Sequence, residues 1–203
     1  MSDTFTFDTK LNDYSSIGLG LSGGIDSALL LYYLLKNDYK IKCYTLVDKN
    51  NNNNTDAAKS IKTYIEELSG KSVVSHDFIE YEKTNSKDKK PQMTKIWAGL
   101  TTNKDIDCLI SGGTQHLSSV NDIWDEADTD KPSEKLWTES KIHDSYVIYR
   151  PFINYNKSWI KTCCDACNIT DKILSISVSC LKLSFPCKNC LWCAEKYEAF
   201  KCY

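Results

Sequence analysis

Six consecutive residues near the amino end, Ser22-Gly23-Gly24-Ile25-Asp26-Ser27, are of types that bind phosphate. Glycines let backbone N–H groups approach an oxyanion, and the free N–H groups at a helix start favour negative charge. Ser22 and Ser27 can donate hydroxyl hydrogen bonds to phosphate oxygens. Asp26 would repel a bare phosphate, so its presence predicts a Mg²⁺ ion that bridges the carboxylate to a polyphosphate. We therefore expect this turn to bind a metal-chelated polyphosphate.

Other phosphate-binding patterns compete for the same segment. Gly18, Gly20 and Gly23 match the G-x-G-x-x-G pattern of dinucleotide sites, which requires a strand before the first glycine. Here the apolar alternation continues through Gly18 and Gly20, which favours placing both in the strand itself. A Walker A loop requires Gly-Lys-Ser/Thr, and this turn contains no lysine. A glycine-rich helix start without a ligand stays open as the alternative.

Four cysteines near the carboxyl end follow the spacing C-x6-C-x2-C-x2-C: Cys180, Cys187, Cys190 and Cys193. Thiolates at such short separations can complete a tetrahedral Zn²⁺ site without help from distant parts of the chain. We expect a reducing compartment, where clustered thiols bind metal more often than they form disulfides. The spacing therefore predicts a structural zinc ion. An iron–sulfur cluster uses the same ligands and stays open, as do buried thiols that cluster by chance.

A second cysteine group, Cys163, Cys164 and Cys167, complicates that assignment. Cys164-x-x-Cys167 combined with Cys187-x-x-Cys190 also forms a double C-x2-C ligand set. However, the second group recurs with Ile160 at three- and four-residue spacing, which is typical of the apolar face of a helix. We therefore expect its members in the core. Two more cysteines lie in predicted strands and are interpreted as packing residues: Cys43 and Cys108.

Apolar periodicity predicts the elements that position these motifs. Five strands are expected at 17–21, 41–47, 71–79, 107–110 and 147–152. Helices are expected at 25–35, 56–68, 93–100 and 157–168. Strands that alternate with helices predict an α/β fold, an open and mostly parallel sheet with helices on both faces. The phosphate turn would then lie between the first strand and the first helix.

Length and composition limit the function classes. With 203 residues, 41% of them hydrophobic and 26% charged, the chain matches a single soluble globular domain, and disorder is excluded. We expect one domain over 1–203, with 179–203 as its zinc-binding knuckle and helix. A formal charge of -2 provides no basic field for nucleic acid, and no apolar run is long enough for a membrane helix. We expect a cytoplasmic protein, in the host cytoplasm if the source is viral, and a homodimer stays open.

Several single residues are candidates of lower specificity. Asp122 and Asp125 lie in the polar stretch 114–145, which is expected to be a loop. They are interpreted as a solvated acidic surface, with a second metal or a substrate contact as the alternative. His76 lies in a predicted strand and is interpreted as structural, whereas His116 follows a second glycine turn and is a pocket candidate.

The phosphate turn resembles the SGGxDS signature of the PP-loop ATP pyrophosphatases. That resemblance implies a Rossmann-like fold of the adenine nucleotide alpha hydrolase type and cleavage of ATP between its α and β phosphates. It assigns pyrophosphate to Ser22, Gly23, Gly24 and Ser27 and Mg²⁺ to Asp26. It also places Asp48, at the end of the second predicted strand, in the region that accommodates adenosine.

Within this group, the carboxyl end is similar to the 7-cyano-7-deazaguanine (preQ0) synthases. The similarity includes the four-cysteine knuckle, the trailing Ala199-Phe200, and Arg150-Pro151-Phe152 followed by Asn156-Lys157-Ser158-Trp159-Ile160. It implies an ATP-dependent C–N ligase of queuosine biosynthesis, which adenylates 7-carboxy-7-deazaguanine and uses ammonia to form first the amide and then the nitrile. Lys157 would then be a catalytic residue, as Asp26 would be, and would act as a point charge on a phosphate. Arg150 could do the same, with a surface ion pair as the alternative.

Three segments depart from the synthase pattern. Asp48-Lys49 and the asparagine run 50–54, Pro91-Gln92, and Gln115-His116-Leu117-Ser118 stand where the synthases have other residues that shape the purine pocket. The ATP part of the resemblance is therefore better matched than the substrate part. Another PP-loop ligase, a nucleotide- or tRNA-modifying enzyme with a different substrate, and a non-catalytic nucleotide-binding module stay open.

Overall fold

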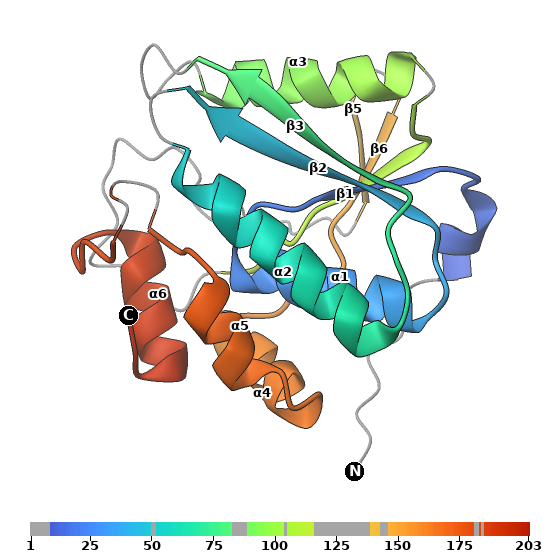
Figure 1. The fold of residues 1–203 in the computed structure, drawn as a ribbon. Helices are drawn as coiled ribbons and strands as arrows, with labels where there is room; N and C mark the ends of the chain where they lie inside the picture. The colour runs from blue at the N-terminus through green and yellow to red at the C-terminus, as the bar shows by residue number, and fades with distance from the viewer. Residues whose placement is uncertain are drawn as a thin grey trace.

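The computed structural model describes 9–49, 52–82, 89–103, 105–115, 139–142, 146–180, 183 and 185–203 of the chain (Figure 1). These residues form one six-stranded sheet with the order β3-β2-β1-β4-β6-β5. Strands β1 to β4 and β6 run parallel to one another, and β5 at the edge runs antiparallel to β6. The strands are β1 (Ile17–Gly20), β2 (Ile41–Asp48), β3 (Ser75–Tyr81), β4 (Cys108–Ile110), β5 (Glu139–Ile142) and β6 (Tyr146–Tyr149).

Helices cover both faces of the sheet, as the alternating pattern predicts. Figure 1 shows α3 alone on one face, and α1, α2 and the carboxyl-terminal helices on the other. The helices are α1 (Ile25–Lys36), α2 (Asn53–Ser69), α3 (Lys89–Thr102), α4 (Lys157–Ala166), α5 (Thr170–Ile176) and α6 (Leu191–Phe200), after a short 3-10 turn, η1 (Thr9–Asp13). The predicted α/β class with a mostly parallel sheet is confirmed.

The centre of the core lies between β1 and α1. Leu19 of β1 and Leu29, Leu30, Leu31 and Leu34 of α1 have no exposed surface. The near-continuous apolar sequence of α1 fits this position, because a helix buried on most of its surface needs apolar residues all round. The strand–turn–helix unit that carries the phosphate turn is therefore held by the largest apolar cluster of the described residues.

Several sequence predictions differ from the structure, among them the helix predicted at 93–100, which begins at Lys89 and ends at Thr102. The stretch 114–145 was expected to be a loop throughout, yet β5 occupies Glu139–Ile142, where a short polar segment gains its hydrogen bonds by pairing with β6. The last predicted strand ends at Tyr149 rather than 152, because Pro151 lacks an N–H group for the ladder and a turn begins there.

The helix predicted at 157–168 ends at Ala166, since Asn168 adopts a φ of 55°, and α5 follows as a separate helix that periodicity did not predict. The strand predicted at 71–79 begins at Ser75. Among the helices that the structure describes, none combines the length and apolar character needed to cross a membrane.

Candidate functional site: a phosphate turn beside a cysteine knuckle

The phosphate turn joins the carboxyl end of β1 to the amino end of α1. Gly23 has a φ of 80°, a left-handed conformation that glycine adopts without strain, and Gly24 is the N-cap of α1. No side chain caps this helix end, and the first N–H groups of any helix lack intrahelical acceptors. Backbone donors and the positive end of the helix dipole therefore converge on the carboxyl edge of a parallel sheet, where open α/β folds bind ligands.

The two serine hydroxyls of the turn have different surroundings. Ser27 is buried, and its Oγ donates to the Gly24 carbonyl oxygen over 2.9 Å. The Oγ atoms of Ser22 and Ser27 lie 3.2 Å apart, so Ser22 can donate to Ser27, whose own proton is already directed at Gly24. Ser22 is exposed. Of the two hydroxyls, Ser22 is thus the one placed to reach an incoming anion, and Ser27 braces the turn.

Close backbone packing fixes the shape of the turn from two sides. A Cβ atom on Gly23 would lie 2.8 Å from the carbonyl oxygen of Asn54 in the first turn of α2. A Cβ atom on Gly112, which follows β4, would lie 3.0 Å from the backbone nitrogen of Ser27. Both distances are shorter than ordinary contacts, so each glycine is required by the approach of a neighbouring element. The second glycine turn thus packs against the first.

Asp26 and Lys157, both predicted from sequence, meet in the structure. Lys157, the first residue of α4, donates from Nζ to Oδ2 of Asp26 in α1, and its side chain is 9% exposed. Burial raises the pKa of Asp26 above its ordinary value, while the ammonium of Lys157 opposes that rise. Oδ1 of Asp26 is buried and has no hydrogen-bond partner among the residues that the structure describes. A carboxylate oxygen of this kind can bind a cation.

Two further charged residues of this region were missed from sequence. Glu195 and Lys196 of α6 are buried, and the negative charge of Glu195 adds to the raised pKa of Asp26. Burial lowers the pKa of Lys196, and the positive charge of Lys157 acts in the same direction. Two carboxylates and two amines from three helices therefore influence one another. The helical spacing could have predicted the burial of Glu195, because it lies four residues from both Leu191 and Ala199, on the buried side of α6.

A buried polar chain supports the entry to the phosphate turn. Thr45 of β2 donates to the carbonyl oxygen of Leu21 over 2.6 Å, and its Oγ1 lies 2.8 Å from Nε2 of His76 in β3. Because the single hydroxyl proton of Thr45 is directed at Leu21, Nε2 of His76 is the donor. Burial lowers the pKa of His76 to about 4, with Lys62 acting in the same direction. His76 is therefore neutral at pH 7, in agreement with its predicted structural role.

The remaining sequence candidates are placed as follows. Asp48 is the last residue of β2, beside Tyr81 of β3, at the same edge of the sheet as the phosphate turn. Arg150 follows β6, and its Cδ lies 3.8 Å from where a Cβ on Gly113 would be, next to the second glycine turn. Three candidates lie outside the described residues: His116, Asp122 and Asp125.

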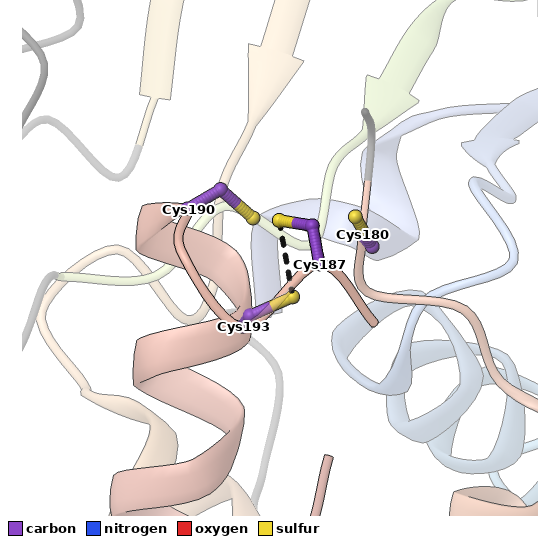
Figure 2. A group of neighbouring side chains, drawn as sticks. All are labelled: Cys180, Cys187, Cys190 and Cys193. Carbon is purple, nitrogen blue, oxygen red and sulfur yellow. Dashed lines mark hydrogen bonds between the residues drawn. The ribbon is translucent and has the colours of Figure 1, made fainter. Parts of the chain in front are cut away.

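The four cysteines of the predicted zinc site come together. Figure 2 shows Cys180, Cys187, Cys190 and Cys193 with their sulfur atoms turned toward one space. All four Sγ atoms lie within 4.8 Å of one another, and those of Cys187 and Cys193 are 4.0 Å apart. Tetrahedral zinc with Zn–S bonds of about 2.3 Å places sulfur atoms about 3.8 Å apart. The donor set and its spacing therefore fit a zinc ion, and small inward shifts would complete the geometry.

Local structure explains how the knuckle forms. Lys188, between two ligands, has a φ of 62°, which reverses the chain, and Cys190 is the N-cap of α6. Burial raises the pKa of the Cys190 and Cys193 thiols, so metal binding there must displace protons. The competing ligand set is not formed: Cys163 and Cys164 are buried in the main core and Cys167 packs against it, as predicted. Cys43 and Cys108 are buried strand residues, also as predicted.

Comparisons with known proteins bear on the fold. No protein-family model and no curated protein matches the sequence. Among solved structures, NMN synthetase from Francisella tularensis is similar, with a TM-score of 0.50 and 17% sequence identity over 84% of this chain and 69% of that chain. PH1313 from Pyrococcus horikoshii Ot3 gives a TM-score of 0.42 and 15% identity over 75% of this chain and 41% of that one. The likeness to the NMN synthetase shows a shared fold.

Proposed function

We propose that this chain is an ATP-dependent adenylating enzyme of the PP-loop type and that the turn 22–27 binds the pyrophosphate portion of ATP. The observation that carries the proposal is the geometry of the turn. Gly23 and Gly24 leave backbone donors at the start of α1, and the partly unpartnered Asp26 carboxylate lies in its first turn. A synthetase with the same fold, the NMN synthetase, supports a ligase over a passive binding module.

Asp26 and Lys157 have different proposed roles at the triphosphate. Asp26 holds a Mg²⁺ ion that, when bound, offsets the charge of the triphosphate. Lys157 is a point charge that can turn from Oδ2 of Asp26 toward a phosphate oxygen, because both groups lie at helix amino ends that face the same site. Ser22 and the backbone N–H groups bind the leaving pyrophosphate and stabilise the charge that develops on it.

For the substrate, we propose 7-carboxy-7-deazaguanine with ammonia as the nitrogen donor. Its carboxylate attacks the α-phosphorus of ATP and releases pyrophosphate, and ammonia then displaces AMP from the acyl adenylate to give the amide. The amide oxygen then attacks the α-phosphorus of a second ATP and releases a second pyrophosphate. Loss of AMP together with the remaining N–H protons leaves the nitrile. The four-cysteine knuckle beside the phosphate turn supports this choice, because the synthases that the sequence resembles carry a knuckle of this spacing.

A second candidate is a related ligase that adenylates a different small carboxylate. The sequence departures at Asp48-Lys49, Pro91-Gln92 and 115–118 favour it, because they fall in segments that shape the substrate pocket in the synthases. Both candidates share the ATP half-reaction. They differ in which carboxylate triggers the release of AMP and pyrophosphate.

The test is an assay of AMP and pyrophosphate release with Mg-ATP, ammonia and 7-carboxy-7-deazaguanine, with the product identified by mass spectrometry. Asp26→Asn keeps the size of the side chain and removes its charge, so we expect pyrophosphate release to fall by about 100-fold or more. Asp56→Asn is the matched control, since Asp56 also lies in the first turn of a helix, α2, and its side chain is 97% exposed. Far-UV circular dichroism must show that both variants fold.

The outcomes separate the candidates. Release of AMP with another carboxylate but not with the deazaguanine would replace the first candidate by the second. Binding of ATP without AMP release under any substrate would reject the enzyme proposal in favour of a binding module. Undiminished turnover in Asp26→Asn would remove the metal role of that residue.

A further inference from the structure

The segment that leads into the knuckle is hydrogen-bonded to the phosphate turn. Val178, two residues before the first cysteine ligand, donates its backbone N–H to the carbonyl oxygen of Gly23 over 2.9 Å. The carbonyl oxygen of Val178 lies 3.7 Å from where a Cβ on Gly24 would be. Gly23 and Gly24 are the residues whose backbone forms the phosphate cradle. The segment 178–180 therefore connects the first cysteine ligand, Cys180, to the backbone of the phosphate turn.

The other end of the knuckle reaches the same site through α6. Two of the four cysteines belong to the start of this helix, because Cys190 is its N-cap and Cys193 lies in its first turn. Two residues beyond Cys193, Glu195 is 2% exposed, and its negative charge contributes to the raised pKa of Asp26 of α1. A metal ion bound by the cysteines would hold together the Val178 segment and the start of α6. The Val178 segment contacts the phosphate turn directly, whereas α6 packs against α4, whose Lys157 donates to Asp26 in the first turn of α1.

We propose that the knuckle clamps the phosphate turn through the Val178–Gly23 hydrogen bond, with the packing of α6 against α4 as a second, indirect link, so that Zn²⁺ at the cysteines and nucleotide at the turn bind cooperatively. This inference rests on nucleotide binding at the turn, as proposed above. Two sites are coupled when each ligand stabilises the conformation that the other requires, and the effect is reciprocal. Zinc must therefore raise nucleotide affinity by the same factor by which nucleotide raises zinc affinity.

The experiment measures that factor in both directions on the full chain. Isothermal titration gives the affinity of AMPPNP, in excess Mg²⁺, for the zinc-loaded and the metal-depleted protein. Competition with a chelator of known affinity gives the affinity of zinc with and without saturating AMPPNP. We expect a factor of about five or more in each direction, the lower end of typical coupling between sites. Protected amides in β1 and α1 during hydrogen exchange would show that the metal-depleted protein keeps its sheet.

Val178→Pro tests the proposed contact itself. Proline has no N–H to donate to Gly23, and the preceding Ser177 has a ψ of 149°, the extended conformation that a residue before proline prefers. Val178→Ala keeps the N–H and is the matched control. We expect Val178→Pro to bind zinc with a coupling factor reduced toward one, and Val178→Ala to keep the factor of the unmodified chain.

Each possible result supports or rejects the proposed coupling. A coupling factor of one in the unmodified chain, with both ligands bound, overturns the clamp proposal and leaves the proposed function intact. Full coupling in a folded, zinc-binding Val178→Pro also overturns it. If zinc-loaded protein fails to bind AMPPNP, the proposed function and the clamp fall together. Should Val178→Pro not fold, the reciprocal measurement on the unmodified chain still supports or rejects the proposal.

Discussion

The phosphate turn and the cysteine knuckle are neighbours that are held in place by different physical means. The turn is built on β1 and α1, whose apolar side chains are fully buried in the main core. The knuckle has its own small cluster, in which Cys180, Cys190 and Cys193 are buried with Cys187 and Trp192 packed against them. Nearby Phe185 is 62% exposed. Burial of apolar surface stabilises the turn. The knuckle instead brings four sulfur atoms close enough to bind one metal ion.

The two regions should therefore lose stability in response to different kinds of change. A region stabilised by core packing loses stability when its volume or backbone is altered, and its stability does not depend on a bound ion. A four-thiolate site gains much of its folding free energy from the bound metal. Loss of one ligand therefore destabilises it mainly by weakening metal binding. The Val178–Gly23 hydrogen bond joins the two regions, so each perturbation should be measured at both sites.

The largest effect is expected for Cys190→Ser. Structural zinc contributes an apparent free energy on the order of 10 kcal/mol, and removal of one thiolate sacrifices most of the specific binding. We expect loss of bound metal by elemental analysis and rapid hydrogen exchange throughout α6, while amides of β1 and α1 stay protected. Cys202→Ser, outside the cluster, is the control. Full zinc occupancy in Cys190→Ser would contradict the ligand assignment.

Gly23→Ala should be the most damaging single change within the turn. An L-residue at a φ of 80° costs about 1–2 kcal/mol, and the new methyl group would lie 2.8 Å from the carbonyl oxygen of Asn54. With about 1 kcal/mol or more for overpacking, we expect the free energy of unfolding in urea to fall by about 3 kcal/mol.

Gly70→Ala is the matched control for this change. Gly70 also has a positive φ, 67°, but a Cβ there would meet nothing within 4 Å. Its variant should lose about 1 kcal/mol, from backbone conformation alone. Equal losses in the two variants would show that the approach of α2 does not constrain the phosphate turn.

A smaller effect is expected from pH acting on the support of the turn. Because the pKa of His76 is lowered to about 4 in the folded protein, the unfolded chain binds a proton first as pH falls. The stability associated with neutral His76 is therefore complete above about pH 6.5 and declines between about pH 6.5 and 4. Since the His76 side chain is partly exposed to solvent, we expect a loss on the order of 1 kcal/mol.

The measurement is a urea titration at a series of pH values for the unmodified chain and for His76→Gln. The difference between the two free energies of unfolding removes the contribution of the other titrating groups, chiefly the carboxylates, which both proteins share. We expect that difference to depend on pH only within this window. A difference that is constant from pH 7 to pH 4 would show that His76 titrates as an ordinary histidine.

The smallest effect is expected at an ion pair on the surface of α4, four residues beyond Lys157. Lys161 donates to Asp165 over 2.5 Å, one helical turn apart, and the two side chains are 39% and 45% exposed. Exposed pairs of this type contribute about 0.3–0.5 kcal/mol. Lys161→Ala should therefore change thermal stability only slightly and leave zinc content and nucleotide affinity unchanged. A loss above about 1 kcal/mol would mean that α4 depends on this pair for its position.

Patterns that repeat over a few residues predicted much of this fold. The apolar spacing indicated β1, β2, β4 and the first two helices close to their observed bounds, because a strand or helix imposes its own period on the residues it buries. It failed for β5, whose hydrogen bonds come from a partner strand, and for α5, which is too short for a clear period. The cysteine spacing predicted the metal-ligand group because all four ligands lie within one short segment.

The sequence by itself determined the chemistry of this protein: a glycine-rich turn with a carboxylate, and four thiols within reach of one ion. Tertiary structure alone decided which distant groups meet. Lys157 reaches Asp26 across 131 positions, Val178 donates to Gly23, and Glu195 is buried near the same carboxylate. Local periodicity reports which face of an element is buried. The order of the strands and the packing of α4 and α6 determine which distant residues that buried face meets.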